Sequence, residues 1–158
     1  MPEGTLTAQF STEDGIGSRL IRWAENGLYS HVDLVLPSGL LGARLDGGVR
    51  VRQPGYAKFT AISRLTVPVP DVGDAVGFAM EQIGKPYNKG AIRDMILHRK
   101  RGFSMTQKSW FCDELLYAIA LAGGTQLLNT ENPLGLTPWE VYLSPKWQME
   151  KLCASPRK

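Results

Sequence analysis

Apolar side chains recur at helical spacing between residues 111 and 122. Phe111, Leu115 and Ile119 fall on one face of a helix, and the glycine pair at 123–124 is a stop signal directly after it. Because the remaining positions are also mostly apolar, this segment is the most hydrophobic helix that the chain predicts. It should lie in the core.

A cysteine, Cys112, occupies the first turn of this predicted helix. The free N–H groups and the positive end of the helix dipole stabilise a thiolate, so this position predicts a lowered pKa and a nucleophilic sulfur. The alternative is that a small apolar side chain is simply packed in the core, as most free cysteines are. Position alone leaves both interpretations open.

Four other segments have helical signals. The first runs from a cap at Ser11 or Thr12 to a stop at Asn26–Gly27. Its apolar positions predict a buried stripe formed by Ile16, Leu20, Trp23 and Ala24. The others are a helix capped by Asp71 that ends near Gly84, a helix over residues 91–98, and a short helix from Thr137 and Pro138 to about Ser144.

Alternating apolar and polar residues between these helices predict strands. The predicted strands are residues 5–10, 31–36, 40–45, 49–52 and 60–67, the last closed by Pro68. Short turns connect the second, third and fourth of these, so they should form an antiparallel meander. The predicted fold class is α+β, an antiparallel sheet of four to six strands with packed helices.

The strand at 31–36 offers a partner for the thiol. His31 and Asp33 lie on the same face because side chains alternate along a strand. Val32, Leu34 and Leu36 lie on the other face. Cys112 lies 81 positions further on, so only tertiary folding can bring it to His31. The alternative for His31 is a histidine whose hydrogen bonds are made at a strand edge, without a catalytic role. The alternative for Asp33 is a polar residue on a solvated sheet surface. The second histidine, His98, sits in a basic run that disfavours an imidazolium.

Composition narrows the function classes. The chain has 158 residues, 43% hydrophobic and 21% charged, which predicts one domain over 1–158 with its core at about 4–143. A net charge of +3 is too weak to indicate a nucleic-acid partner, and no phosphate-binding loop is present. No apolar run suits an integral membrane segment, and the N-terminus lacks signal-peptide character. We therefore expect a protein that is cytoplasmic as synthesised, with delivery elsewhere left open.

No cofactor or metal is expected from the sequence. Zinc usually needs three or four ligands, and the chain has no C-x-x-C, H-x-x-x-H or H-E-x-x-H motif. The second cysteine, Cys153, lies in a polar tail, so one disulfide is permitted without forming a disulfide framework.

Four short motifs, in this order, resemble the circularly permuted NlpC/P60 superfamily of papain-like cysteine hydrolases, and its YiiX/YebB-like branch most closely. They are Tyr29-Ser30-His31-Val32, Gly47-Gly48-Val49-Arg50, Ile83-Gly84-Lys85-Pro86-Tyr87 and Trp110-Phe111-Cys112-Asp113-Glu114-Leu115. In that branch the histidine strand precedes the cysteine helix, as it does here. The resemblance implies that Cys112 is the nucleophile and His31 the base.

The sequence departs from that family at the third catalytic position. The family usually supplies a polar residue, often Glu, from the strand after the histidine strand, where this chain has Gly42. Asp33, two residues from His31 on the same face, is the candidate replacement. Asp46 fits a turn residue better.

Three functional classes follow. The first is a cysteine hydrolase of amide or peptide bonds, with a peptide or peptidoglycan fragment as substrate by resemblance. The second is an acyltransferase or a lipid or ester hydrolase of the same fold, which an apolar groove beside Cys112 would favour. The third is a non-catalytic binding or structural protein, which the missing Glu would favour.

Overall fold

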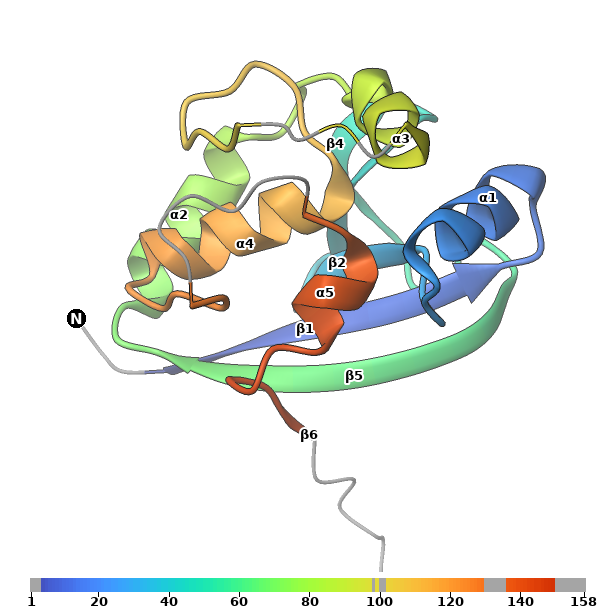
Figure 1. Ribbon diagram of the computed structural model, residues 1–158. Helices are drawn as coiled ribbons and strands as arrows, with labels where there is room; N and C mark the ends of the chain where they lie inside the picture. Colours follow the sequence, from blue (N-terminus) through green and yellow to red (C-terminus); the bar gives the residue numbers. More distant parts are fainter. Residues whose placement is uncertain (1–3, 98, 100–101, 130–135, 150–158) are drawn as a thin grey trace, which may run out of the picture.

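The computed structural model describes residues 4–97, 99, 102–129 and 136–149, and is organised around one antiparallel sheet (Figure 1). The sheet has six strands in the order β4-β3-β2-β1-β5-β6. Their bounds are β1 Gly4–Glu13, β2 His31–Leu36, β3 Gly39–Arg44, β4 Gly48–Arg52, β5 Phe59–Val69 and β6 Gln148–Met149. With its helices, this architecture confirms the predicted α+β class.

The meander is confirmed, and the two long central strands extend further than predicted. β1 pairs with β2 on one side and with β5 on the other, and it continues to Glu13. Ser11 therefore pairs with His31 and Ile62 in the sheet, which makes the predicted helix cap at this point wrong. Pro68 does not close β5 but lies within it, opposite Thr5.

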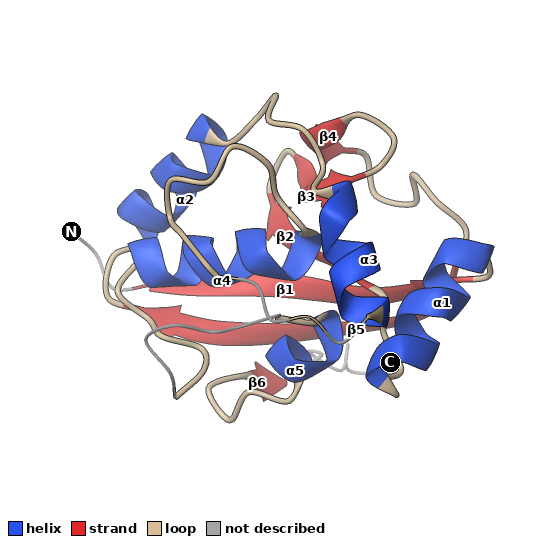
Figure 2. Cartoon of the chain, turned by 45° about the horizontal axis from the view of Figure 1, so that its top comes forward, coloured by secondary structure: helices blue, strands red, loops and turns tan. Residues whose placement is uncertain are grey.

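The described residues also form five helices. Their bounds are α1 Ile16–Glu25, α2 Val72–Glu81, α3 Lys89–Ile96, α4 Cys112–Ala122 and α5 Pro138–Tyr142. Figure 2 shows α4 in front of β2. As predicted, Asp71 caps α2 by accepting a hydrogen bond from the backbone N–H of Asp74, and Thr137 caps α5 in the same way through Glu140. In the described residues no helix is long and apolar enough to cross a membrane.

The central helix, α4, lies against β2 and β3 and beside α2. Phe111, Leu115 and Ile119 are buried as predicted, and the helix is covered nearly all round from Cys112 to Ala120. Its polar first-turn residues, Asp113 and Glu114, are buried too. α4 is thus the centre of the hydrophobic core.

The first helix, α1, contradicts the prediction of a buried stripe. Ile16 is 86% exposed, Trp23 is 73% exposed and Leu20 is 37% exposed, whereas Ile21 is the buried residue of the helix. α1 packs on α3 and β1 through the side that holds Ile21. The helix is therefore amphipathic, but its strongest apolar stripe faces outward.

The helices that flank the core were predicted with smaller errors. α2 ends at Glu81, three residues before the predicted stop at Gly84, and its buried positions are Ala75 and Ala79. α3 begins at Lys89 and ends at Ile96, two residues before the predicted end. His98, most of its basic run and Cys153 lie outside the described residues.

Candidate active site

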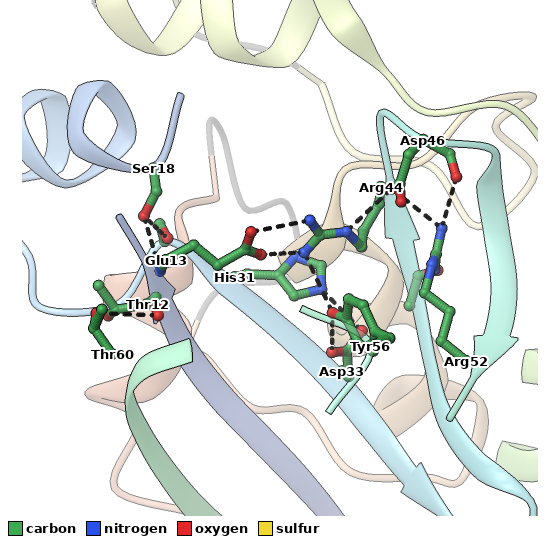
Figure 3. A network of polar contacts seen from close by, with 12 residues as sticks. Thr12, Glu13, Ser18, His31, Asp33, Arg44, Asp46, Arg52, Tyr56 and Thr60 are labelled. Atoms are coloured by element: carbon green, nitrogen blue, oxygen red, sulfur yellow. Dashed lines mark hydrogen bonds and ion pairs between the residues drawn. The ribbon is translucent and has the colours of Figure 1, made fainter. Parts of the chain in front are cut away.

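β2 places His31 and Asp33 on one face, as its alternation predicts. The imidazole Nε2 of His31 and Oδ1 of Asp33 are 2.8 Å apart, and both side chains are nearly inaccessible to solvent (Figure 3). Since Nε2 is used by the carboxylate, Nδ1 is the ring nitrogen left for another partner. Among the described residues no hydrogen bond reaches Nδ1.

The carboxylate of Asp33 is held from several sides. Its second oxygen, Oδ2, accepts a hydrogen bond of 2.8 Å from the hydroxyl of Tyr56. Burial by itself would raise the pKa of Asp33. His31, Tyr56 and the charge of Arg44 outweigh that effect, so the pKa lies below its ordinary value. Asp33 is therefore ionised at neutral pH, and its carboxylate accepts the hydrogen bond from His31.

Arg44 links this pair to the rest of a polar network. Its guanidinium donates to both carboxylate oxygens of Glu13 and to Oδ1 of Asp46, and it reaches the Tyr56 hydroxyl at 3.3 Å. Figure 3 shows these side chains converging from β1, β3 and the loop before β5. No local pattern in the sequence indicated Tyr56 or Arg44 as site residues, because neither lies near His31 in the chain.

Cys112 begins α4, and its surroundings keep this start in place. The backbone N–H of Phe111 donates to Oε2 of Glu114 at 3.2 Å, which satisfies one free amide of the first turn. One residue earlier, Trp110 forms a parallel bridge with Tyr87, with backbone hydrogen bonds of 2.9 Å and 3.1 Å on either side. The segment that carries the cysteine is thus tied to the loop after α2.

The same loop explains why motifs that are far apart in the sequence belong together. Val49 donates its N–H to the carbonyl of Lys85 and accepts from the N–H of Gly84, both at 2.9 Å. Three of the four motifs that carry the family resemblance therefore meet around the start of α4. The fourth, at His31, lies on the strand against which α4 packs.

The sulfur of Cys112 is buried, with 2% of the residue exposed. Burial raises the pKa of the thiol well above its ordinary value, the charge of Asp113 adds to the rise, and the backbone N–H of Val32 opposes it. The prediction of a lowered pKa is therefore wrong, because desolvation of the thiolate outweighs the helix dipole. The resting group is a neutral thiol.

The structure brings Cys112 next to the histidine strand but does not link it directly to the histidine. The Val32 amide that acts on the sulfur belongs to the residue after His31, and the Asp33 charge also acts on the thiol. The thiol itself donates to Oδ1 of Asp113 at 3.9 Å. Among the described residues no hydrogen bond joins Cys112 to His31.

A groove of about 370 Å³ opens beside His31. Its polar walls come from β1, the start of α1, and the β3–β4 turn, and they include Glu13, Ser18, Ser30, Arg44 and Asp46. Its apolar part is formed by Ile21, Ala43, Leu45, Tyr87 and Ile92. His31 is among the lining residues of the groove, whereas Cys112 is not.

No family model matches this sequence, and no curated protein matches it. Among solved structures, the chain is similar to the metalloprotein YiiX (DUF1105) from Escherichia coli O157:H7. The TM-score is 0.62 at 14% identity, over 92% of this chain and 95% of that one. The similarity shows a YiiX-like α+β fold.

The side chains in the described part of this chain do not fit a resident metal ion of the kind that a metalloprotein holds. In the parts of the chain that the structure describes, no group of three or more His, Cys, Asp or Glu side chains is placed to hold one. His31 and Asp33 are bonded to each other, and their next polar neighbour is a tyrosine hydroxyl.

Proposed function

We propose that this protein is a cysteine hydrolase of amide or peptide bonds, with Cys112 as nucleophile, His31 as base and Asp33 as the residue that orients the base. The proposal includes membership of the permuted NlpC/P60 superfamily, which the four ordered motifs favour. The observation that carries it is the buried hydrogen bond between His31 and Asp33, made on the strand against which the cysteine helix packs.

The raised pKa of Cys112 changes how the reaction should begin. A preformed thiolate–imidazolium pair is not favoured in a site where the charged sulfur is desolvated. His31 Nδ1 would instead take the thiol proton as the sulfur attacks the substrate carbonyl. The ionised Asp33 stabilises the imidazolium that forms at this step.

The rest of the reaction follows from the same groups. The backbone N–H of Cys112, at the start of α4, has no partner within the helix and can donate to the oxyanion. His31 then returns the proton to the leaving amine, which leaves a thioester on Cys112. Water, deprotonated by His31, breaks the thioester and restores the thiol.

The groove favours a polar substrate with some apolar character. Charged and hydroxyl side chains form one part of its wall and aliphatic side chains the other, as a peptide requires. Peptides, including peptidoglycan fragments, are therefore the first substrates to test.

A lipid or ester substrate is the second candidate, favoured by the outward stripe of α1. Ile16, Leu20 and Trp23 are exposed on the helix whose other residues line the groove. An apolar surface next to the groove would suit an acyl chain.

The non-catalytic alternative rested on Gly42, where the family often has Glu. Its support weakens because His31 already has a carboxylate partner, Asp33, at 2.8 Å.

The experiment compares peptide amides, peptidoglycan peptides and acyl esters as substrates of the full chain. Samples are quenched in acid during turnover, and intact mass spectrometry detects the acyl-enzyme. We expect an acyl adduct that maps to Cys112, absent in Cys112→Ala and retained in the matched control Cys153→Ala. Hydrolysis that persists in Cys112→Ala would rule out this mechanism.

The preferred substrate decides between the two enzymatic candidates. Faster turnover of peptide amides supports the peptidase, and turnover of long-chain esters alone supports the lipid hydrolase. No adduct and no turnover with any of these substrates would favour the non-catalytic class.

A further inference from the structure

The carboxylate of Asp33 lies where a side chain at position 42 of the neighbouring strand, β3, would otherwise lie. A Cβ atom added to Gly42 would lie 1.9 Å from Oδ1 of Asp33. Leu34 of β2 pairs with Leu41 of β3, so Asp33 and Gly42 are the next residues along the two antiparallel strands. Gly42 therefore leaves room for a carboxylate that comes from β2, and any side chain at this position would displace it.

Tyr56 closes the other side of the same carboxylate. Its hydroxyl donates to Oδ2 at 2.8 Å, while Oδ1 is taken by His31. With both oxygens bonded, the carboxylate cannot rotate without losing a buried hydrogen bond.

Two arginines hold Tyr56 in turn. The guanidinium of Arg44 lies 4.9 Å from the centre of the Tyr56 ring, and that of Arg52 lies 5.6 Å from it. Arg44 also donates to the oxygen of the Tyr56 hydroxyl. The hydrogen of that hydroxyl therefore points to Asp33. Figure 3 shows Tyr56 between the two arginines and Asp33.

We infer that Tyr56 is a positioning residue for the hydrolase proposed above, and that it acts through Asp33 in a site that only glycine at position 42 permits. Tyr56 fixes the carboxylate, and the carboxylate fixes His31 as the tautomer that carries its hydrogen on Nε2. Nδ1 is thereby kept unprotonated and ready to accept a proton. The inference rests on the proposed function for its purpose, but its geometry can be tested without a substrate.

The test is nitrogen NMR of the histidine rings in the full chain. The chain has two histidines, so a His98→Gln variant assigns the signals. In the wild type we expect the neutral His31 ring to be the Nε2–H tautomer, with a downfield proton from the bond to Asp33. In Tyr56→Phe, which keeps the ring and its packing, we expect a mixed tautomer and a broadened or lost downfield proton.

Kinetics add a second measurement once a substrate is known. Tyr56→Phe should lower kcat roughly tenfold with KM unchanged, because the hydroxyl contributes to positioning and not to binding. The matched control is Tyr142→Phe, which removes a tyrosine hydroxyl on α5 and should change neither kcat nor the His31 spectrum. An unchanged His31 tautomer in Tyr56→Phe would overturn the inference.

Position 42 gives an independent test. Gly42→Ala should abolish the downfield His31 proton because the new methyl group and the carboxylate cannot share one space. The double variant Asp33→Ala with Gly42→Glu supplies a carboxylate from β3 and should restore that signal at least in part. If Gly42→Ala folds and keeps the wild-type His31 spectrum, the shared site does not exist.

These outcomes separate the inference from the function. If no substrate is hydrolysed but Tyr56→Phe changes the His31 spectrum as expected, only the proposed hydrolase function is overturned. If substrate is hydrolysed but Tyr56→Phe leaves the His31 spectrum unchanged, only the positioning role of Tyr56 is overturned.

Discussion

Two helices with similar sequence signals, α4 and α1, lie in opposite environments. Both have apolar residues at helical spacing, and both patterns predict a buried stripe. α4 is buried nearly all round, whereas α1 buries Ile21 and exposes Ile16 and Trp23. The comparison shows that periodicity identifies an amphipathic helix but does not say which of its faces meets the core.

The reason lies in what each helix can reach. α4 follows a segment tied by backbone hydrogen bonds to the loop after α2, and it packs on β2, β3 and α2. α1 follows β1 at the far end of a long strand, where it packs on α3 and β1 and meets α5 through the hydrogen bond between Glu25 and Trp139. These contacts leave the face that holds Ile16 and Trp23 exposed.

The largest expected effect is in the buried helix. Leu115→Ala should lower the free energy of unfolding by about 3 kcal/mol, because Leu115 is 1% exposed in the middle of the core. Urea denaturation of the variant and the wild type measures the change. A loss below about 1 kcal/mol would contradict the burial of α4.

Replacing Glu25 of α1 should give the next largest change in the free energy of unfolding, and only at high pH. Burial raises the pKa of Glu25 from 4.5 to about 8, so the folded state holds a proton that the unfolded state releases. The contribution of protonated Glu25 to the free energy of unfolding is thus fully present below about pH 4.5 and is lost as the pH rises towards 8. Glu25→Gln should therefore stabilise the protein by ~1–2 kcal/mol at pH 8 and change little at pH 4.5.

Thermal unfolding at both pH values measures this effect. Gln keeps an oxygen that can accept from the backbone N–H of Trp139, as Glu25 does at 3.3 Å. An equal effect at both pH values would show that Glu25 does not titrate in this range.

The start of α4 should be sensitive to its cap. Glu114→Ala removes the acceptor for the backbone N–H of Phe111 and for the side chain of Gln107. We expect a loss of about 1 kcal/mol in urea denaturation. Glu140→Ala on α5 is the control, because it leaves the α4 cap intact and should cost less.

The smallest effect is expected on the outward face of α1. Trp23→Ser should change the free energy of unfolding by less than about 0.5 kcal/mol, since the side chain is 73% exposed. A loss as large as that of Leu115→Ala would mean that Trp23 is covered in solution and would remove the contrast between the helices.

Much of the fold could be predicted from the sequence because its signals are local. The alternation in β2, the short turns of the meander, and the caps at Asp71 and Thr137 depend on neighbouring residues, and the structure confirms each. The alternation also predicted that His31 and Asp33 share a face, and their hydrogen bond confirms it. The ends of β1 and β5 were wrong because pairing with each other extends both strands beyond their local pattern.

The sequence by itself determined most of the elements, the buried helix that begins with Cys112, and the shared face of His31 and Asp33 on β2. Only the tertiary structure decided which face of α1 is covered, that Gly42 makes room for Asp33, and that the Tyr56 hydroxyl donates to Asp33. It also decided the state of the thiol, because the helix dipole is a local property whereas desolvation depends on every element packed around the sulfur. Local interactions act between residues close in the chain, but burial depends on residues that only folding brings together.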